Sequence, residues 1–160
     1  MRTNSLIAAL LGCAALAACA SAPEPPPAGT VMGTMRPYKI GGRTYTPRYD
    51  PDYEETGLAS WYGPGHHGKP TADGERFDQN EVSAAHKTLP LPSIVEVKNL
   101  ENGKKIRVRV NDRGPFVDGR IIDLSKEAAE QLGMLQRGVA KVRVKYLGPA
   151  ERKGVKVARR

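Results

Sequence analysis

From Leu58 onward the chain consists of short stretches in which apolar and polar side chains alternate. Residues 93–100 and 105–110 follow this pattern, with valine and isoleucine on one face and lysine and arginine on the other. The Asn102-Gly103 pair between them predicts a β-hairpin with a type I′ turn. Residues 142–146 alternate in the same way and predict a closing strand. Six or so short strands favour a compact closed barrel, because closure removes the exposed edges at which sheets aggregate.

One segment has the pattern of a helix. Ser125 is a favourable N-cap, Glu127 places a negative charge in the first turn, residues 128–132 form the body, and Gly133 supplies a left-handed stop. The sequence therefore predicts a mainly β fold with one or two short helices and no internal repeat.

The first residues have the composition of a bacterial secretory leader. Arg2 precedes an apolar run over residues 6–18, which is shorter than the ~20 residues needed to span a bilayer. The run ends in Leu-Ala-Ala-Cys19, which resembles the lipobox of lipoproteins. We expect residues 1–18 to be a signal peptide and Cys19 to be lipidated. The alternatives are a lipobox at Cys13 and a signal peptide cut without lipidation.

Three segments outside the predicted barrel differ from it in composition. Residues 19–35 are rich in proline and predict an extended tether, and residues 149–160 form a basic tail. Residues 36–56 contain four tyrosines among glycines and prolines, namely Tyr38, Tyr45, Tyr49 and Tyr53. We expect these tyrosines to pack the segment onto the barrel. The alternative is a sugar site, because aromatic faces stack on pyranose rings.

The net charge of +8 favours anionic partners such as nucleic acid, a phospholipid surface or the acidic polymers of a bacterial envelope. The predicted export of the chain argues against nucleic acid as the partner. So does the lack of a recognisable motif that could enter a groove of DNA or RNA. An alanine rather than an aspartate follows Cys19, which favours anchoring at the outer membrane. Both cysteines lie in the leader, so we expect neither a disulfide nor thiolate chemistry in the mature domain, which we expect to be a monomer.

Short polar motifs place titratable side chains among the turns of this domain. Glu75, His86, Asp112 and Asp123 each lie in one of them, and such a set is typical of an active site. Each residue also has a structural explanation. Asp112 suits an Asx turn or an ion pair with Arg113, and Asp123 suits a helix N-terminus, whereas Glu75 suits a solvated loop and His86 the barrel wall.

These motifs, at residues 57–63, 68–77, 84–90, 111–116 and 120–125, resemble those of the rare lipoprotein A family. The resemblance implies a six-stranded double-psi β-barrel over residues 57–148 that needs no cofactor. It also implies a lytic transglycosylase, which cleaves peptidoglycan between N-acetylmuramic acid and N-acetylglucosamine. By position in the motifs, Asp112 is the expected catalytic carboxyl group, with Glu75 and His86 in the same site. We expect the substrate to contact Tyr62, Arg113, Arg120 and Asp123.

The chemistry of such an enzyme requires one well-placed acid. Most glycoside hydrolases use two carboxyl groups, one to protonate the leaving oxygen and one to attack or to activate water. A lytic transglycosylase uses the 6-hydroxyl of the sugar as the nucleophile, so one carboxyl group can give a proton and take one back. The acid must be protonated near neutral pH, and we expect the charge of Glu75 to favour this. The alternative function is a non-catalytic wall-binding module of the expansin type.

The His66-His67 pair lies in a glycine-rich loop without further ligands at a suitable spacing, so we predict no metal site. Many members of the family carry a C-terminal glycan-binding module that directs them to the division septum. The sequence ends soon after the predicted barrel, so these residues by themselves predict neither septal targeting nor its absence, and the same holds for a preference for peptide-free strands.

Overall fold

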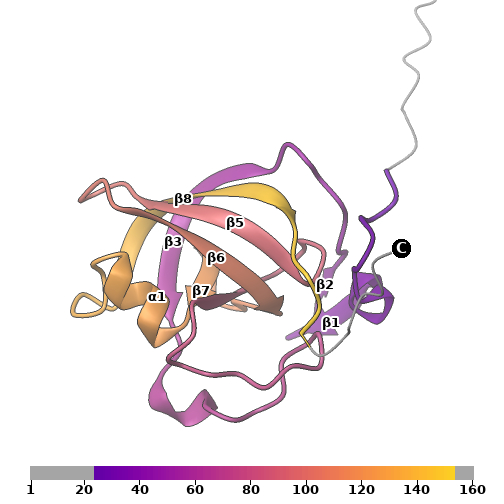
Figure 1. Cartoon of the computed structure of the whole chain (residues 1–160), viewed down its shortest axis with the longest axis horizontal. Helices are drawn as coiled ribbons and strands as arrows, with labels where there is room; N and C mark the ends of the chain where they lie inside the picture. Colours follow the sequence, from indigo (N-terminus) through magenta and orange to yellow (C-terminus); the bar gives the residue numbers. More distant parts are fainter. Residues whose placement is uncertain (1–23, 154–160) are drawn as a thin grey trace, which may run out of the picture.

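The computed structural model describes residues 24–153, so that the predicted signal peptide, Cys13, Cys19 and the end of the basic tail lie outside the described residues. Six strands close into a barrel in the order β3-β7-β4-β6-β5-β8 (Figure 1). They are β3 (Glu54–Trp61), β4 (Ser83–His86), β5 (Ser93–Asn99), β6 (Lys105–Asp112), β7 (Arg120–Leu124) and β8 (Val139–Pro149). This architecture confirms the predicted mainly β, six-stranded barrel.

Two of the strand pairs are parallel, β3 with β7 and β4 with β6, whereas the other four are antiparallel. A parallel pair cannot be joined by a tight turn, so each needs a long crossover connection. Three of the seven predicted site residues, Tyr62, Glu75 and Arg113, lie in the connections from β3 to β4 and from β6 to β7, and β7 itself pairs with both β3 and β4. The topology therefore gathers loops that are distant in the sequence.

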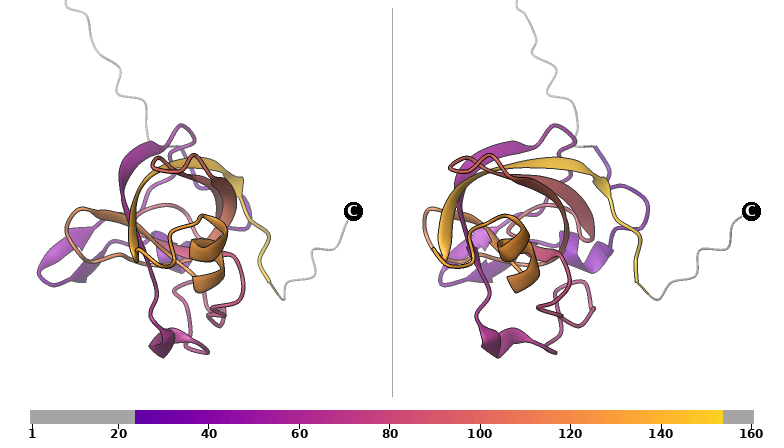
Figure 2. Two further views of the ribbon diagram at one scale, coloured as in Figure 1. Left: turned by 90° about the vertical axis from the view of Figure 1, so that its left-hand side faces the viewer. Right: turned by 60° about the vertical axis from the view of Figure 1, so that its left-hand side comes forward.

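The interior is filled by apolar side chains from every strand of the barrel, alanines from β3 and β4 and branched aliphatic residues from the other four strands. Inward positions of β5, β6 and β8 are completely buried, as the alternating pattern predicted; they include Val95, Val97, Val108, Val110, Val142 and Val144. Figure 2 shows the strands curving around this interior.

The predicted β5–β6 hairpin is present, with Val95 opposite Val108, but the predicted turn type is wrong. A type I′ turn needs positive φ at both central residues. Gly103 has φ of 77°, whereas no residue other than glycine between residues 24 and 153 has positive φ. Asn102 instead uses its side chain, which accepts a hydrogen bond from the Lys104 amide and donates one to Leu132 O. The loop is thus tied to the helix.

The predicted helix is confirmed as α1 (Lys126–Gln131), and it lies at one end of the barrel (Figure 1). The Ser125 hydroxyl accepts hydrogen bonds from the amides of Ala128 and Ser83, each at 3.2 Å. Gly133 follows the last turn with φ of 69°. The apolar face of the helix, with Ala128 and Ala129, is completely buried in the core. Two 3-10 turns, Met32–Met35 and Pro64–His66, are the other helical segments among the described residues.

The tyrosine-rich segment begins with a separate two-stranded hairpin, β1 (Tyr38–Ile40) and β2 (Arg43–Tyr45), at the end of the barrel opposite α1 (Figure 1). Its four tyrosines divide into two pairs. Tyr49 and Tyr53 pack on the barrel, against Tyr146 and His86. Tyr38 and Tyr45 stack on each other with ring centroids 5.2 Å apart, and both rings also contact Phe116.

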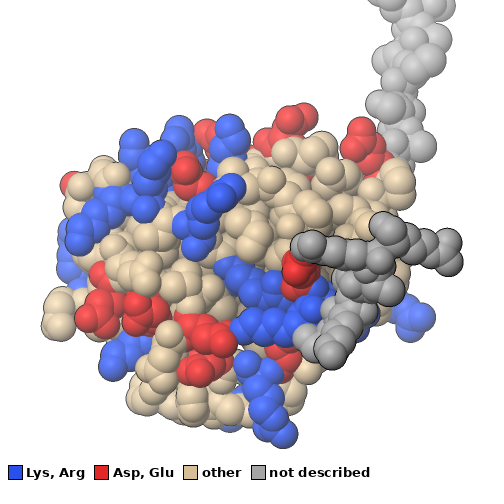
Figure 3. All heavy atoms as spheres, in the orientation of Figure 1, with Lys and Arg blue, Asp and Glu red and all other residues tan. Residues whose placement is uncertain are grey.

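Lysines and arginines occupy outward positions of β5, β6 and β8, as in the paired residues Lys98, Lys105 and Arg143. Figure 3 shows basic side chains in several places on one face of the molecule, with acidic side chains between them. Between residues 24 and 153 the structure contains no helix long and apolar enough to cross a bilayer.

Candidate active site

Asp112 is the last residue of β6, and the alternation of the strand decides which way it faces. Asn111 and Asp112 are neighbours, so their side chains point to opposite sides. The Oδ1 atom of Asp112 accepts hydrogen bonds from the amides of Ala72 and Arg113, at 2.9 and 2.8 Å. The Oδ2 atom has one longer contact, with the Tyr62 hydroxyl at 3.3 Å. Oδ1 therefore fixes the carboxyl group, and Oδ2 is the oxygen available to a ligand.

The Asp112 side chain opens into a cleft of about 450 Å³, which we call the Asp112 cleft. The residues that line it include Ser60, Trp61, Tyr62, His66, Asp112, Arg113, Phe116, Val117, Arg120 and Asp123. The structure thus brings together five of the predicted site residues, from β6, β7 and the loops after β3 and β6. Neither Glu75 nor His86 lines this cleft.

Asp123 provides a second carboxylate in the Asp112 cleft. Its Oδ1 accepts a hydrogen bond from the Ser60 hydroxyl at 2.5 Å, and its Oδ2 lies 3.6 Å from the Arg120 guanidinium. Arg120 Nε is buried and has no hydrogen-bond partner among residues 24–153. Both contacts fix the Asp123 carboxyl group in the cleft.

Tyr62 lies between the two carboxylates. Burial raises the pKa of its hydroxyl, and the negative charges of Asp112 and Asp123 raise it further. The hydroxyl is therefore a neutral hydrogen-bond donor at any physiological pH.

Arg113 also lines the cleft, but its guanidinium is occupied by the backbone. Nη1 donates to the carbonyls of His86 and Leu89, and Nη2 donates to the carbonyl of Thr34, at 2.7–3.1 Å. The group lies 5.9 Å from the centre of the Tyr38 ring. Burial lowers the pKa of Arg113 to about 10, so it remains charged at neutral pH. Arg113 thus joins the N-terminal segment to the turn after β4.

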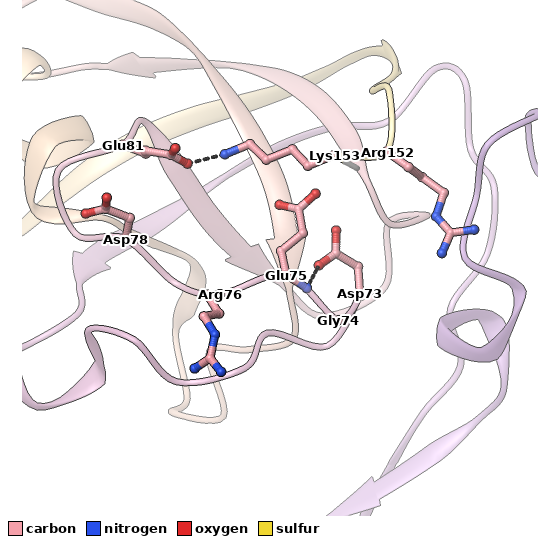
Figure 4. Close-up of a pocket in the computed structure, with 8 residues that line it drawn as sticks. All are labelled: Asp73, Gly74, Glu75, Arg76, Asp78, Glu81, Arg152 and Lys153. Atoms are coloured by element: carbon pink, nitrogen blue, oxygen red, sulfur yellow. Dashed lines mark hydrogen bonds and ion pairs between the residues drawn. The ribbon is translucent and has the colours of Figure 1, made fainter. Parts of the chain in front are cut away.

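Glu75 lies in a different pocket, of about 640 Å³, which we call the Glu75 pocket (Figure 4). It is lined by Asp73, Gly74, Glu75, Arg76, Asp78, Glu81, Arg152 and Lys153. The Glu75 carboxylate is ion-paired with Arg109 and accepts a hydrogen bond from Asn111 Nδ2 at 3.0 Å. Burial alone would raise the pKa of Glu75, but the hydrogen bonds from Arg109 and Asn111 outweigh it and lower the pKa. Glu75 is therefore ionised at neutral pH.

Asp73, two residues before Glu75, also faces Arg109, with 4.0 Å between the charged atoms. Burial raises the pKa of the Asp73 carboxyl group. The loop that holds both acids runs along the end of β6, because the Asp73 amide donates to the carbonyl of Asn111. The Glu75 pocket and the Asp112 cleft therefore lie on the two sides of one strand end.

His86 is buried in the wall of the barrel, with 3% of its surface exposed. Its Nδ1 accepts hydrogen bonds from the amides of Thr88 and Leu89, so the ring proton is on Nε2. Nε2 lies 2.8 Å from the Tyr53 hydroxyl, which donates in turn to Glu55. Burial lowers the pKa of His86 to about 3, and the charges of Arg113 and Lys87 contribute. The ring is therefore neutral and stabilises the turn that accepts the hydrogen bonds of Arg113.

Sequence analysis missed several residues of the Asp112 cleft, among them Ser60, Phe116 and His66. Ser60 and Phe116 lie in the motifs, but they were not selected as candidates because neither side chain titrates near neutral pH. His66 was considered only as a metal ligand, whereas its ring packs 5.2 Å from that of Tyr62. Between residues 24 and 153 no three histidine, cysteine or acidic side chains converge on a point where they could hold a metal ion.

Comparison with known proteins places this geometry in a family. A family model described as lytic transglycolase matches residues 54–144. The endolytic peptidoglycan transglycosylase RlpA of Campylobacter jejuni is 54% identical over 126 residues, which cover 78% of this chain and 46% of that protein. RlpA of Pseudomonas aeruginosa is 53% identical over 116 residues, covering 72% of this chain and 34% of the relative.

The chain therefore spans less than half the length of these two curated relatives. Among solved structures, the Streptomyces papain inhibitor matches with a TM-score of 0.49 and 30% identity, over 59% of this chain and 94% of the inhibitor. The family model covers more than half of the chain and extends over nearly the whole barrel, including every residue that shapes the Asp112 cleft. The chain belongs to the lytic transglycolase family of double-psi β-barrel domains, together with the RlpA proteins.

Proposed function

We propose that this protein is an endolytic transglycosylase that cleaves the β-1,4 bond between N-acetylmuramic acid and N-acetylglucosamine in peptidoglycan, leaving 1,6-anhydro-muramic acid ends. The observation that carries the proposal is the placement of Asp112. Two backbone amides hold Oδ1, while Oδ2 faces a cleft lined by aromatic and charged side chains. Family membership supports the same reaction.

Asp112 serves as acid and then as base. The protonated Oδ2 gives its proton to the glycosidic oxygen as the bond from this oxygen to C1 of the muramic acid breaks. The 6-hydroxyl of the same sugar then bonds to C1 and returns its proton to Oδ2, which restores the enzyme. The leaving oxygen and the 6-hydroxyl both occupy the β face of the ring, so one carboxyl group on that face serves both steps.

The other cleft residues bind and orient the sugar. Ser60 and Arg120 hold the Asp123 carboxyl group in the cleft, where it stabilises the positive charge that develops at C1. The Tyr62 hydroxyl touches Oδ2 of Asp112 and directs that oxygen toward the substrate. Arg120 lines the cleft, and its guanidinium donates to the hydroxyl, acetyl or lactyl oxygens of the sugars.

Glu75 and His86 act as positioning residues in this proposal. Glu75 binds Asn111, the residue before Asp112, and so fixes the end of β6. The loop that carries Glu75 also supplies the Ala72 amide that holds Oδ1 of Asp112. His86 shapes the turn whose carbonyls bind Arg113, the residue after Asp112.

The location of the protein is part of the same proposal. Lipidation of Cys19 would anchor the chain to the outer membrane, and the proline-rich tether would let the barrel reach the wall in the periplasm as a monomer. Neither a cofactor, a metal ion nor nucleic acid takes part.

Digestion of purified peptidoglycan, followed by mass spectrometry, tests the reaction. The purified chain should release products with 1,6-anhydro ends. Asp112→Asn keeps the shape of the side chain and an acceptor for the Ala72 amide but loses the acid, so release should fall at least about a hundredfold. Asp52→Asn, which removes an exposed carboxylate outside the cleft, is the matched control and should be as active as the wild type.

Two results would contradict the proposal. One is release of anhydro ends by Asp112→Asn at the wild-type rate. The other is sedimentation of the protein with peptidoglycan without any anhydro product, which would favour the non-catalytic wall-binding module instead.

A further inference from the structure

The β1–β2 hairpin forms a pocket of its own beside the Asp112 cleft. This pocket has a volume of about 270 Å³ and is lined by Ile40, Gly41, Arg43, Tyr45, Phe116 and Asp118; we call it the hairpin pocket. Its volume is below the range of pockets for drug-sized ligands and suits a single ring. The hairpin lies outside the residues that the family model matches, so the family assignment gives it no role.

The hairpin pocket adjoins the Asp112 cleft. Phe116 lines both of them, and it lies on the loop that follows Asp112. The Phe116 side chain is 41% exposed although the Tyr45 ring packs against it at 5.4 Å. A chain-like ligand that leaves the cleft on this side must therefore pass over the Phe116 ring and reach the hairpin.

The chemistry of the pocket combines apolar faces with polar groups at the rim. Phe116, Tyr45 and the 43% exposed Ile40 offer apolar contact surface. Arg43 and Asp118 form an exposed ion pair across the pocket and present both donors and acceptors. A pyranose ring needs this combination, because its C–H faces pack on aromatic rings while its hydroxyl groups bind charged and polar groups at the edge.

The hairpin is fixed in place before any ligand arrives. The Tyr38 hydroxyl donates to the carbonyl of Lys87 at 2.8 Å, and the Tyr38 ring stacks on Tyr45 and faces the Arg113 guanidinium. These contacts tie the hairpin to the barrel and to the residue next to Asp112. A sugar bound there would not have to order the hairpin, which lowers the entropic cost of binding.

We propose that the β1–β2 hairpin, with Tyr45 and Phe116 as the stacking surface, is an additional sugar subsite for the glycan strand that passes through the Asp112 cleft. The proposal rests on the proposed function for the identity of the ligand, a glycan of alternating N-acetylated sugars. The hairpin binds a sugar beyond those that flank the broken bond, so it contributes only when the strand is long enough to reach it.

Binding of peptide-free glycan oligosaccharides of increasing length, measured by titration calorimetry in the Asp112→Asn background, tests the subsite. Affinity should rise in a step at the length that first reaches the hairpin. Tyr45→Leu removes the stacking ring and should lower the affinity for strands beyond this step about threefold to tenfold. The ratio of long-strand to short-strand affinity should therefore fall by the same factor.

Matched variants separate recognition from folding. Tyr49→Leu removes a ring that packs on Tyr146 away from the pocket, and it should keep the wild-type ratio. If Tyr45→Leu does not fold, Ile40→Ser changes an exposed side chain of the hairpin pocket and should lower the ratio by about threefold. Leu100→Ser, at a side chain with nearly the same exposed fraction of 42%, is its control.

Equal losses of affinity for short and long glycan strands would contradict the proposed subsite, because the hairpin would then only support the loop of the Asp112 cleft. Wild-type ratios in both Tyr45→Leu and Ile40→Ser would overturn it too. These outcomes are independent of catalysis. A protein that binds long strands through Tyr45 but releases no anhydro ends would contradict the proposed reaction and leave the subsite intact.

Discussion

At the scale of single residues, the site depends on the way two neighbours at the end of β6 divide their contacts. Asn111 turns toward Glu75 and Asp112 toward Tyr62. The same end of β6 thus connects an ionised, salt-bridged carboxylate on one side with a carboxyl group open to a cleft on the other. The imidazole of His86 acts at a distance, through the turn that holds Arg113.

The buried His86 makes stability depend on pH. Its pKa is lowered to about 3, from an ordinary value of 6.5. Between these values the unfolded chain binds a proton that the folded protein does not, so the free energy of unfolding should decrease as the pH falls below about 6.5. The slope is at most about 1.4 kcal/mol per pH unit.

Thermal unfolding between about pH 7 and pH 5, above the titration of most carboxylates, measures this slope. His86→Asn keeps a polar group near the position of Nδ1 but cannot titrate, so its midpoint should change less with pH than that of the wild type. His67→Asn, at an exposed histidine, should keep the wild-type slope. Identical slopes for His86→Asn and the wild type would exclude His86 as the source.

At the scale of elements, a few close contacts fix how strands and helix meet. The Ser125 hydroxyl joins α1 to β4, because it accepts from one amide of each. Gly57 allows β3 to approach β7, since a Cβ there would lie 2.6 Å from Cγ2 of Ile121. Both residues lie in motifs that also carry site residues, so the same short segments build the barrel and the cleft.

Ser125→Ala should lower the free energy of unfolding by about 1–2 kcal/mol, because it leaves two buried amides without an acceptor. Urea unfolding measures the loss. Thr56→Ala, which removes an exposed hydroxyl from β3, should change stability far less. Equal losses in the two variants would contradict the role of the N-cap.

Gly57→Ala should lower the free energy of unfolding by about 1–3 kcal/mol, because the added methyl group meets three side-chain carbons of Ile121 within 3.3 Å. The same urea experiment applies. Gly65→Ala serves as the control, since nothing lies within 4 Å of the Cβ it would add. A loss as large in Gly65→Ala would show that the effect does not come from the contact with Ile121.

At the scale of the whole molecule, Arg113 joins the N-terminal segment to the barrel. Its guanidinium binds carbonyl groups in the segment before β1 and in the turn after β4. The β1–β2 hairpin, the Asp112 cleft and the turn that His86 stabilises therefore form one connected structure.

Arg113→Lys should loosen this connection, because an ammonium group cannot reach three carbonyl groups in two directions. Hydrogen exchange of the β1–β2 amides should become about tenfold faster, while that of the β5–β6 amides stays unchanged. Arg36→Lys, at an exposed arginine of the same segment, is the control. Equal acceleration in the hairpin and in the barrel would mean that Arg113 stabilises the fold as a whole instead.

The sequence alone determined the elements that depend on local patterns. The alternation of apolar and polar residues identified the β5–β6 hairpin and β8, because a strand with one buried face has an apolar side chain at every second position. The N-cap and the glycine stop identified α1, and the motif residues identified the barrel and Asp112 as the central candidate. The turn type was wrong because Asn102 makes contacts with α1 that are distant in sequence.

Only the tertiary structure decided which side chains share a cleft. In the closed barrel one cleft is lined by Tyr62, Asp112, Arg120 and Asp123. Glu75 lies on the other side of β6, and His86 is buried in the barrel wall. The tertiary structure also places the β1–β2 hairpin against Phe116. The pattern along a chain indicates which face of a strand a side chain occupies. The neighbours of that side chain across the barrel depend on how distant strands pair and where their loops meet.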